Sequence, residues 1–440
     1  MSTRRQDVDD ALTRLSRLHP RKIDLSLGRL QRLLTALGNP QDQLPPTIHV
    51  AGTNGKGSTC AYLAHMARAN GQKVHVYTSP HLVDFNERIQ IDSQPVGDQA
   101  LIEAFARCEA ANFGEPITFF EITTAAAFLL FSEHPADLLI LEVGLGGRFD
   151  ATNVIAKPVL CVITAIGLDH QEFLGDEIGM IAREKAGICK FGVPTIIGRQ
   201  DPEAEAALLK EARRVGALTY VWGQDFRAYQ QHGRLTYEDE SRVWDLPSPG
   251  LIGPHQIDNA GAAAACAAVL QWPEACVADG IAHATWPARL QNITRGPLGE
   301  IARSHNAELW LDGGHNPAAA AALSHALADM DEREDRPLVL IAGFSPKKDV
   351  QGWCSHFAGL ARRLIAVEFN SGRGGSQPAE AVAAASNAAG LKAEVATSLL
   401  NAVKNAAKEV PAPRILIGGS LYLAGEALAL GGAAPHQTPG

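Results

Sequence analysis

A strand–loop–helix pattern near the N-terminus constrains the fold of this chain more than any other feature. The β-branched stretch Ile48–Val50 runs directly into the glycine-rich segment Gly52–Thr59, and a helical stretch, Cys60–Ala67, follows. Glycines allow backbone N–H groups to converge on phosphate oxygens, a helix N-terminus adds positive potential, and a lysine such as Lys56 reaches the outer phosphates. The pattern therefore predicts a loop that binds a polyphosphate.

The spacing within this loop differs from the usual G-x-x-x-x-G-K-[ST] motif. Gly52 and Gly55 are only three positions apart, and Gly57 follows Lys56 where a serine or threonine normally stands. A tight structural turn is therefore the alternative interpretation of the glycines alone. If a nucleotide binds, Ser58 or Thr59 is placed to face a magnesium ion.

Short apolar runs alternate with longer alanine- and leucine-rich helical patterns along most of the chain, which indicates βα units and a mostly parallel sheet. The runs are continuously apolar, as expected for strands covered by helices on both faces. The expected strands are residues 47–51, 73–78, 138–143, 159–164 and 194–198, and then 308–312, 338–343, 363–368 and 414–418.

These two series of strands predict two α/β domains in a chain of 440 residues. Between the two series, the sequence of residues 220–250 predicts a small antiparallel sheet, and that of Asn259–Leu270 predicts a helix. The segment Trp286–Pro297 is expected to connect the domains, with a boundary near residue 295, so that the domains are residues 1–295 and 296–440. The last eight residues are expected to form a loose tail.

Composition excludes several classes of protein. The formal net charge of -9 argues against general binding to nucleic acid or to a membrane surface, although a local basic pocket remains compatible with an anionic substrate. The seven cysteines are scattered and form no C-x-x-C pair, so a disulfide framework or a zinc site is not expected. With no signal-like N-terminus and no apolar run long enough to cross a bilayer, we expect a cytoplasmic enzyme.

Polar side chains follow the expected strands where those strands end. Ser79, Glu142, His170 and Asp312 each come shortly after an apolar run, and ligands of open α/β sheets bind beyond the carboxyl ends of the strands. A carboxylate such as Glu142 needs a partner there. Magnesium coordination and an ion pair with Arg148 are both compatible with the sequence.

Two further residues have ordinary interpretations from sequence alone. His170 is a weak magnesium ligand on chemical grounds, because magnesium prefers oxygen. Lys185 lies in a helical run beside Glu184, which by itself predicts a solvated ion pair rather than a site.

Taken together, the motifs resemble the bacterial family of dihydrofolate synthases/folylpolyglutamate synthases, within the Mur ligase superfamily. The resemblance covers nearly the whole chain. Its blocks are Ala51–Thr59, Ser79–Arg88, Thr118–Glu121, Leu141–Asn153, Leu168–His170, Arg183–Ile188 and Asp312–Pro317. It implies an N-terminal P-loop ATPase domain of the Mur ligase type with a mostly parallel sheet, and a smaller Rossmann-like C-terminal α/β domain for glutamate ligation.

The resemblance also implies roles for individual residues. Lys56, Lys185 and His315 are expected in catalysis, with Lys185 carbamylated so that it offers oxygen atoms to magnesium. The expected ATP-binding residues are Thr53, Asn54, Gly55, Lys56, Gly57, Ser58, Asn259, Arg289 and Asp312. The expected metal ligands are Ser79, Glu142, His170 and Lys185. The expected substrate-binding residues are Asp24, Leu25, Ser26, Arg88, Thr118, Phe119, Phe120, Glu121, Phe149, Asp150, Ala151 and Arg373.

The implied reaction joins L-glutamate to dihydropteroate and to tetrahydrofolate at the expense of ATP, through an acyl phosphate, with Mg²⁺ (two ions) as the cofactor. The partners are small molecules, and a monomer is expected. A monofunctional folylpolyglutamate synthase is the close alternative. Three alternatives are more distant. A cell-wall Mur ligase should have a further N-terminal domain, and only about 46 residues precede the loop. A nucleotide-binding switch would not need polar groups from both domains, and a nicotinamide-binding enzyme should have a G-x-G-x-x-G motif at its first helix, which is missing here.

Overall fold

The computed structural model describes residues 3–18, 26–370 and 375–431. The chain divides into two compact units. The first contains Met1–Pro80, Asn86–Gly250 and Ile257–Ala284. The second contains His81–Phe85, Leu251–Gln256 and Thr285–Gly440. The long final segment of the second unit therefore begins at Thr285, whereas the sequence predicts a boundary near residue 295.

The first unit is built on an eight-stranded sheet with the order β4-β3-β2-β5-β1-β6-β7-β8. From β2 to β8 neighbouring strands are parallel, and β3 and β4 add an antiparallel edge. The strands are β1 (Thr47–Ala51), β2 (Val74–Tyr77), β3 (Ile89–Ile91), β4 (Gln94–Pro95), β5 (Leu138–Glu142), β6 (Leu160–Ile163), β7 (Pro194–Ile197) and β8 (Leu218–Val221). Strand β1 lies at the centre, between β5 and β6, so the loop that follows it opens in the middle of the sheet.

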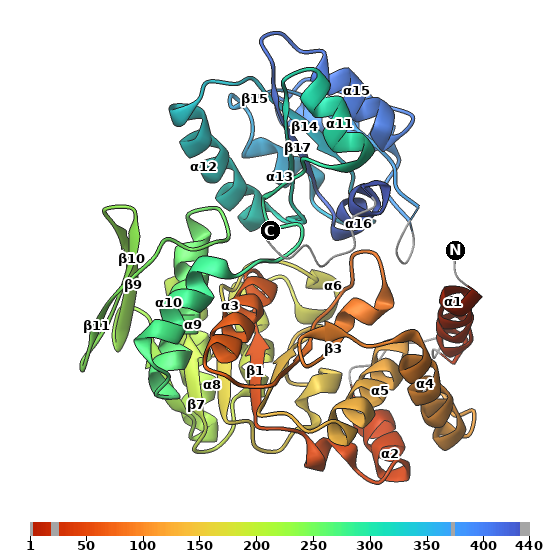
Figure 1. Ribbon diagram of the computed structural model, residues 1–440, viewed down its shortest axis with the longest axis vertical. Helices are drawn as coiled ribbons and strands as arrows, with labels where there is room; N and C mark the ends of the chain where they lie inside the picture. The colour runs from red at the N-terminus through yellow and green to blue at the C-terminus, as the bar shows by residue number, and fades with distance from the viewer. Residues whose placement is uncertain (1–2, 19–25, 371–374, 432–440) are drawn as a thin grey trace. The chain divides into compact units, whose positions relative to one another are not determined.

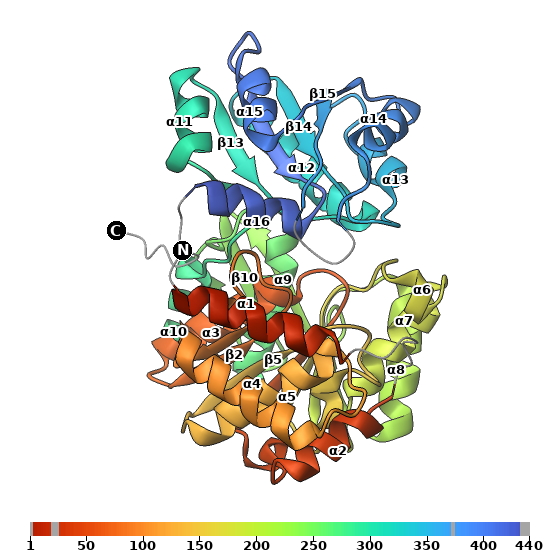
Figure 2. The ribbon, with the colours of Figure 1, turned by 90° about the vertical axis from the view of Figure 1, so that its right-hand side faces the viewer.

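Helices cover this sheet because its central strands are apolar on both faces. Helix α3 (Lys56–Ala69) lies along β1, with α9 (His255–Val269) and α10 (Glu274–His283) nearby (Figure 1). Helix α4 (Asp98–Asn112) lies beside α5 (Phe119–Glu133) (Figure 2). The remaining helices of the unit are α1 (Thr3–Ser16), α2 (Gly28–Ala36), α6 (Gln171–Leu174), α7 (Ile178–Lys185) and α8 (Pro202–Val215), with short 3₁₀ turns η1 (Pro40–Gln43), η2 (Phe85–Arg88), η3 (Ala151–Val154) and η4 (Ala186–Ile188).

A separate antiparallel sheet interrupts the first unit, as the sequence predicts for residues 220–250. It contains β9 (Phe226–Gln231), β10 (Arg234–Asp239) and β11 (Val243–Leu246), in the order β11-β10-β9. Tyr237 stacks between Phe226 and Trp244, at ring-centroid distances of 6.1 and 5.2 Å. This aromatic row gives a small sheet a hydrophobic face of its own.

The second unit is a six-stranded sheet with the order β12-β13-β17-β14-β15-β16, parallel except for β12. Its strands are β12 (Gln291–Asn292), β13 (Glu308–Leu311), β14 (Leu338–Ala342), β15 (Ala361–Ala366), β16 (Ala393–Val395) and β17 (Arg414–Gly418). Alternate strand residues face two apolar clusters. One contains α11 (Gly296–Ser304), α15 (Leu399–Ala407) and α16 (Leu421–Leu430), and the other α12 (Pro317–Arg333), α13 (Val350–Ser355) and α14 (Ala379–Ala388).

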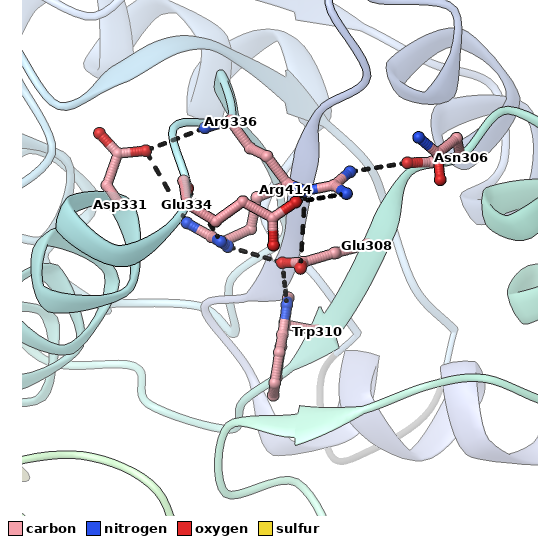
Figure 3. A network of polar contacts seen from close by, with 7 residues as sticks. All are labelled: Asn306, Glu308, Trp310, Asp331, Glu334, Arg336 and Arg414. Atoms are coloured by element: carbon pink, nitrogen blue, oxygen red, sulfur yellow. Dashed lines mark hydrogen bonds and ion pairs between the residues drawn. The ribbon is translucent and has the colours of Figure 1, made fainter.

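A polar network closes the sheet of the second unit at the amino ends of its strands (Figure 3). Arg414, only 3% exposed, donates to Glu308 at 2.7 Å, and the indole N–H of Trp310 donates to the same carboxylate at 3.0 Å. Burial raises the pKa of Glu308, but the hydrogen bonds from Trp310 and Arg414 outweigh it, so the pKa is lowered. The stabilisation is therefore present above the ordinary pKa of a glutamate and is lost as pH falls.

Replacing Arg414 with alanine is expected to destabilise the protein by about 2–4 kcal/mol, because it leaves a partly buried carboxylate without its nearest cation. Arg362 is the matched control, since its side chain is 48% exposed and pairs with Glu409 on the surface. Its alanine variant should lose less than about 1 kcal/mol. Urea unfolding at neutral pH measures both, and equal losses in the two variants would contradict the assignment of Arg414 to a buried network.

The expected strands are observed with ends that differ by at most two residues. Strand β15 begins at Ala361 rather than at 363, and α9 begins at His255 rather than at Asn259. The sequence does not predict β3, β4, β8, β12 and β16, which are short, and of which β4, β8, β12 and β16 are edge strands. Edge strands lack the apolar run that burial on both faces imposes. The predicted tail lies outside the described residues.

Candidate active site

The glycine-rich loop connects β1 to α3 at the carboxyl end of the central strand. Its geometry requires glycine at two positions. Gly52 has φ +149°, and a Cβ there would lie 1.8 Å from Oγ1 of Thr164. Gly55 has φ +88°, and a Cβ there would lie 2.2 Å from Oδ1 of Asn259. Glycine is therefore required at both positions for two reasons: the backbone has a positive φ, and a neighbouring side chain occupies the place of a Cβ.

The first part of the loop is anchored to the end of β6. The backbone N–H groups of Thr53 and Asn54 both donate to the carbonyl of Ala165, at 2.9 and 3.1 Å. Oγ1 of Thr53 donates to the carbonyl of Gly167 at 3.0 Å and accepts from its N–H at 3.1 Å. These two residues hold the shape of the loop, and helix α3 follows it from Lys56, so the N–H groups of its first turn lie at the end of the loop.

Two lysines converge on one backbone oxygen of the loop. Nζ of Lys56 donates to the carbonyl of Gly52 at 3.0 Å, and Nζ of Lys185, at the end of α7, donates to the same oxygen at 2.8 Å. Lys185 is 5% exposed. Burial, followed by the positive charge of Lys56, lowers the pKa of Lys185 to about 7, against the opposing effect of Asp169 and Asp150. The amine of Lys185 therefore loses its proton far more readily than that of an exposed lysine.

Glu142 ends β5 beside this loop. It pairs in register with Val50 of β1, and its side chain is buried. Its Oε2 accepts the backbone N–H of Ser79 at 3.1 Å, which brings two predicted metal ligands together. The guanidinium of Arg148, the alternative partner for Glu142, instead pairs with Glu211 at 2.6 Å and with Glu184 at 3.4 Å. Arg148 is therefore engaged by other carboxylates, and the magnesium role of Glu142 stays a prediction.

His170 lies on the loop after β6, in a left-handed conformation with φ +52°. Its side chain is about half exposed, and Nε2 lies 3.9 Å from a carboxylate oxygen of Asp169. Among the described residues, no group of three His, Cys, Asp or Glu side chains is arranged to hold a metal. A magnesium site here would need the hydroxyl of Ser79, phosphate oxygens and a carbamate on Lys185 besides Glu142, a set that fits the preference of magnesium for oxygen.

The predicted pterin region begins at the N-terminus of α5. Thr118 caps this helix by accepting the N–H of Glu121 at 3.1 Å, and the Glu121 carboxylate accepts the N–H of Thr118 at 2.7 Å, which forms a capping box. Arg29 of α2 makes two 3.1 Å contacts with the same carboxylate. Glu121 is thus used mainly to join α5 to α2.

Two phenylalanines of this region differ in their surroundings. Phe120 packs on Gly144, because a Cβ at Gly144 would lie 2.4 Å from its ring. Phe149 is 44% exposed, so its ring is not part of the core. Ser26 lies two residues before α2, Arg88 ends η2, and Asp24, Leu25 and Arg373 lie outside the described residues.

The second unit contributes a polar turn around Asp312, which directly follows β13. Its carboxylate is 5% exposed and accepts the N–H groups of Leu290 at 2.8 Å and Gly314 at 2.6 Å. Leu290 has φ +41°, so the carboxylate holds a strained turn that carries Arg289. Nδ1 of His315 lies 3.1 Å from the carbonyl of Gly313. Asp312 and His315, which follow β13, are therefore joined to the turn of Arg289 before β12.

Comparison with known proteins assigns both units. Residues 50–267 match the Mur ligase middle domain, and residues 298–430 match the C-terminal domain of dihydrofolate synthetase. A folylpolyglutamate synthase of Lacticaseibacillus casei is 37% identical over 421 residues, which cover 90% of this chain and 92% of that protein. The chain belongs to the dihydrofolate synthase/folylpolyglutamate synthase family of ATP-dependent Mur ligases.

Solved structures of the family show the same fold. Escherichia coli FolC in complex with DHPP and ADP aligns with a TM-score of 0.85 at 30% identity, over 96% of this chain and 97% of that one. A bifunctional folylpolyglutamate synthase/dihydrofolate synthase with Mn, AMPPNP and L-glutamate bound aligns with a TM-score of 0.83 at 28% identity, over 96% and 97%. These relatives bind nucleotide, a divalent metal and small-molecule substrates. No helix in the described part of the present chain is long and apolar enough to cross a membrane.

The family assignment confirms the α/β fold that the sequence analysis predicts, whereas the individual site residues stay predictions. The geometry adds one residue to them. Asp169 raises the pKa of Lys185, and its side chain is 11% exposed. Its position after β6, next to His170, is the sequence signal that could have identified it as part of the site of a folate ligase.

Proposed function

We propose that the protein joins L-glutamate to dihydropteroate, which gives dihydrofolate, and to tetrahydrofolate, which gives polyglutamates. A carboxylate oxygen of the pteroate or folate attacks the γ-phosphorus of ATP and ADP leaves. The α-amine of glutamate then attacks the acyl phosphate, and phosphate leaves. The observation that carries the proposal is the pair of amines, Lys56 and Lys185, on the carbonyl of Gly52 beside the buried carboxylate of Glu142.

In this reaction the chain positions and neutralises charge rather than supplying a nucleophile. The N-terminus of α3 and the ammonium of Lys56 would hold the phosphates. Asp312 would act from the second unit by holding the turn of Arg289. Phe149 would stack on the pterin, and His315 and Arg373 would meet glutamate.

We propose that the divalent metal is Mg²⁺, as two ions, and that Ser79, Glu142, His170 and Lys185 hold them. Bound magnesium neutralises charge on the transferring phosphoryl group. An ammonium cannot bind a cation, so Lys185 must first lose its proton and add to carbon dioxide, which gives a carbamate and releases the proton. The low pKa of its amine supports this step.

The free, buried thiols of all seven cysteines support a reducing, cytoplasmic setting for the protein. We expect the protein to be a monomer.

The test is phosphate release from ATP by the purified protein with glutamate and magnesium, with dihydropteroate or tetrahydrofolate as the acceptor. Release with both acceptors, dependent on glutamate, is the expected result. The L. casei relative is named only as a folylpolyglutamate synthase, so release with tetrahydrofolate alone would assign the monofunctional alternative. ATP turnover that needs no carboxylate acceptor would refute the ligase.

A further inference from the structure

A buried chain of hydrogen bonds runs from the strand before the phosphate loop to the loop after β5. His49, in the middle of β1, is fully buried, and its Nε2 lies 2.8 Å from Oγ1 of Thr152. Oγ1 of Thr152 in turn donates to Oδ1 of Asp150 at 2.5 Å. All three residues belong to the first unit, and Thr152 and Asp150 are 0% and 4% exposed.

The direction of each hydrogen bond follows from the chemistry of the groups. An ionised carboxylate only accepts, so the hydroxyl proton of Thr152 is committed to Asp150, and its oxygen accepts the Nε2–H of His49. Burial, and next the charge of Lys190, lowers the pKa of His49 to about 3, so the ring is neutral and carries its proton on Nε2. Nδ1 of His49 has no hydrogen-bond partner among the described residues.

Donors from its own loop hold the carboxylate of Asp150. It accepts the N–H of Leu145 at 2.8 Å, the N–H of Thr152 at 3.0 Å and the Thr152 hydroxyl. A carboxylate offers about four lone-pair sites. Most of its hydrogen-bonding capacity is therefore used to hold the loop.

We propose that His49 and Thr152 are positioning residues for the pteroate or folate substrate, and that they act by fixing the Asp150 carboxylate, which in turn sets the loop Gly144–Asp150. The inference rests on the proposed function, because Phe149 and Ala151 flank Asp150 and are predicted to contact that substrate. In this arrangement, Asp150 contributes to binding through the backbone that it orders.

The other end of the same loop is held independently. The N–H of Arg148 donates to the carbonyl of Glu184 at 2.8 Å, and the amide of Asn153 donates to the carbonyls of Arg148 and Gly187, both at 3.0 Å. These contacts join the loop to the end of α7, where Lys185 lies, and none involves the Asp150 carboxylate. Loss of the His49–Thr152–Asp150 chain should therefore impair folate binding more than nucleotide binding.

The test compares Thr152→Val, which keeps the shape but removes the hydroxyl, with Thr152→Ser, which keeps the hydroxyl. Thr152→Val is expected to raise KM for dihydropteroate at least tenfold and KM for ATP less than threefold, since a buried carboxylate loses a charge-assisted hydrogen bond. Thr152→Ser should stay within about threefold of the wild type for both. A parallel rise of the two KM values, or equal defects in the two variants, would overturn the proposal.

A second pair of variants tests the histidine, and keeps the proposal testable if Thr152→Val does not fold. His49→Gln retains a donor near Nε2, whereas His49→Leu removes it. His49→Leu should reproduce the effect of Thr152→Val, and the double variant should be no worse than Thr152→Val alone, because both changes break one chain. Additive losses would show that the two residues act separately.

Hydrogen exchange provides a measurement that needs no substrate. In Thr152→Val the backbone amides of residues 144–153 should exchange at least tenfold faster, while peptides from α5 should exchange as in the wild type. Unchanged exchange in residues 144–153 would show that the His49–Thr152–Asp150 chain of hydrogen bonds does not hold this loop. If the wild type uses neither dihydropteroate nor tetrahydrofolate, the proposed function fails, and the exchange result still decides whether the chain of hydrogen bonds holds the loop.

Discussion

The Lys185→Met variant is expected to lose about 100- to 1,000-fold in turnover, because a proposed ligand of the metal that neutralises charge at the reacting phosphate disappears. The same change should make the fold more stable. Folding moves the pKa of Lys185 from its ordinary 10.5 to about 7, which corresponds to a penalty on the order of 4 kcal/mol at pH 7. A buried methionine carries no such penalty. Activity and stability should thus change in opposite directions.

The pH dependence of this stability gain has a definite sign. Between pH 7 and 10.5 the unfolded chain binds more protons at this lysine than the folded chain, so the wild type gains stability as pH rises through that window. The advantage of Lys185→Met should therefore be largest below pH 7 and should shrink toward pH 10. Urea unfolding in buffer free of carbon dioxide, at pH 6.5 and pH 9, measures it.

Lys210→Met is the control, since Lys210 is exposed on α8. It should change neither turnover nor the pH dependence of unfolding. Near-normal turnover of Lys185→Met would remove Lys185 from the proposed metal site. A variant that is less stable than the wild type at both pH values would instead show that the amine is not held in an unfavourable neutral form.

Gly52→Ala should have a comparable effect on the nucleotide site. A Cβ at this position would lie 1.8 Å from Oγ1 of Thr164, and the backbone φ of +149° is one that alanine rarely adopts. The loop must shift, and with it the carbonyl that receives both Lys56 and Lys185. We expect kcat/KM for ATP to fall at least about 100-fold and the fold to lose about 3 kcal/mol or more.

Gly71→Ala separates the effect of the positive φ from the effect of the clash between the new Cβ and Thr164. Gly71 also has a positive φ, +76°, but nothing lies within 4 Å of its would-be Cβ. It should cost only about 1 kcal/mol and leave the kinetics unchanged. Steady-state kinetics with ATP as the varied substrate, together with thermal unfolding, compare the variants. If Gly52→Ala behaves like Gly71→Ala, the close packing against Thr164 is unimportant for the site.

The positions of the strands and of the phosphate loop could be predicted because burial imposes a pattern on local sequence. Val50 and Ala51 of β1 are buried on both sides of the sheet, and the turn that follows needs glycine, so both features are visible within a few residues. Edge strand β8 escaped prediction, because Leu218 and Tyr220 are exposed and the run is only four residues long.

The roles of Lys185 and Asp150 could not be predicted from the residues around them. Lys185 resembles a surface lysine in its own helix, and the pKa of its amine falls only because the fold buries it near Lys56, where it donates to the carbonyl of Gly52, 133 residues away in sequence. Asp150 stays a predicted substrate-binding residue, and two of its three donors are the backbone N–H groups of Leu145 and Thr152, which carry no side-chain signature. Long-range contact and backbone donors are the two kinds of information that sequence motifs omit.

The way the phosphate loop is packed also bears on how the first unit folds. The loop, residues 52–56, rests on Thr164 and Ala165 at the end of β6 and on Asn259 of α9. Strand β1 likewise has its neighbours in the sheet, β5 and β6, far along the chain. Because contacts so distant in sequence form slowly, a chain that ends before α9 should lack a finished nucleotide site.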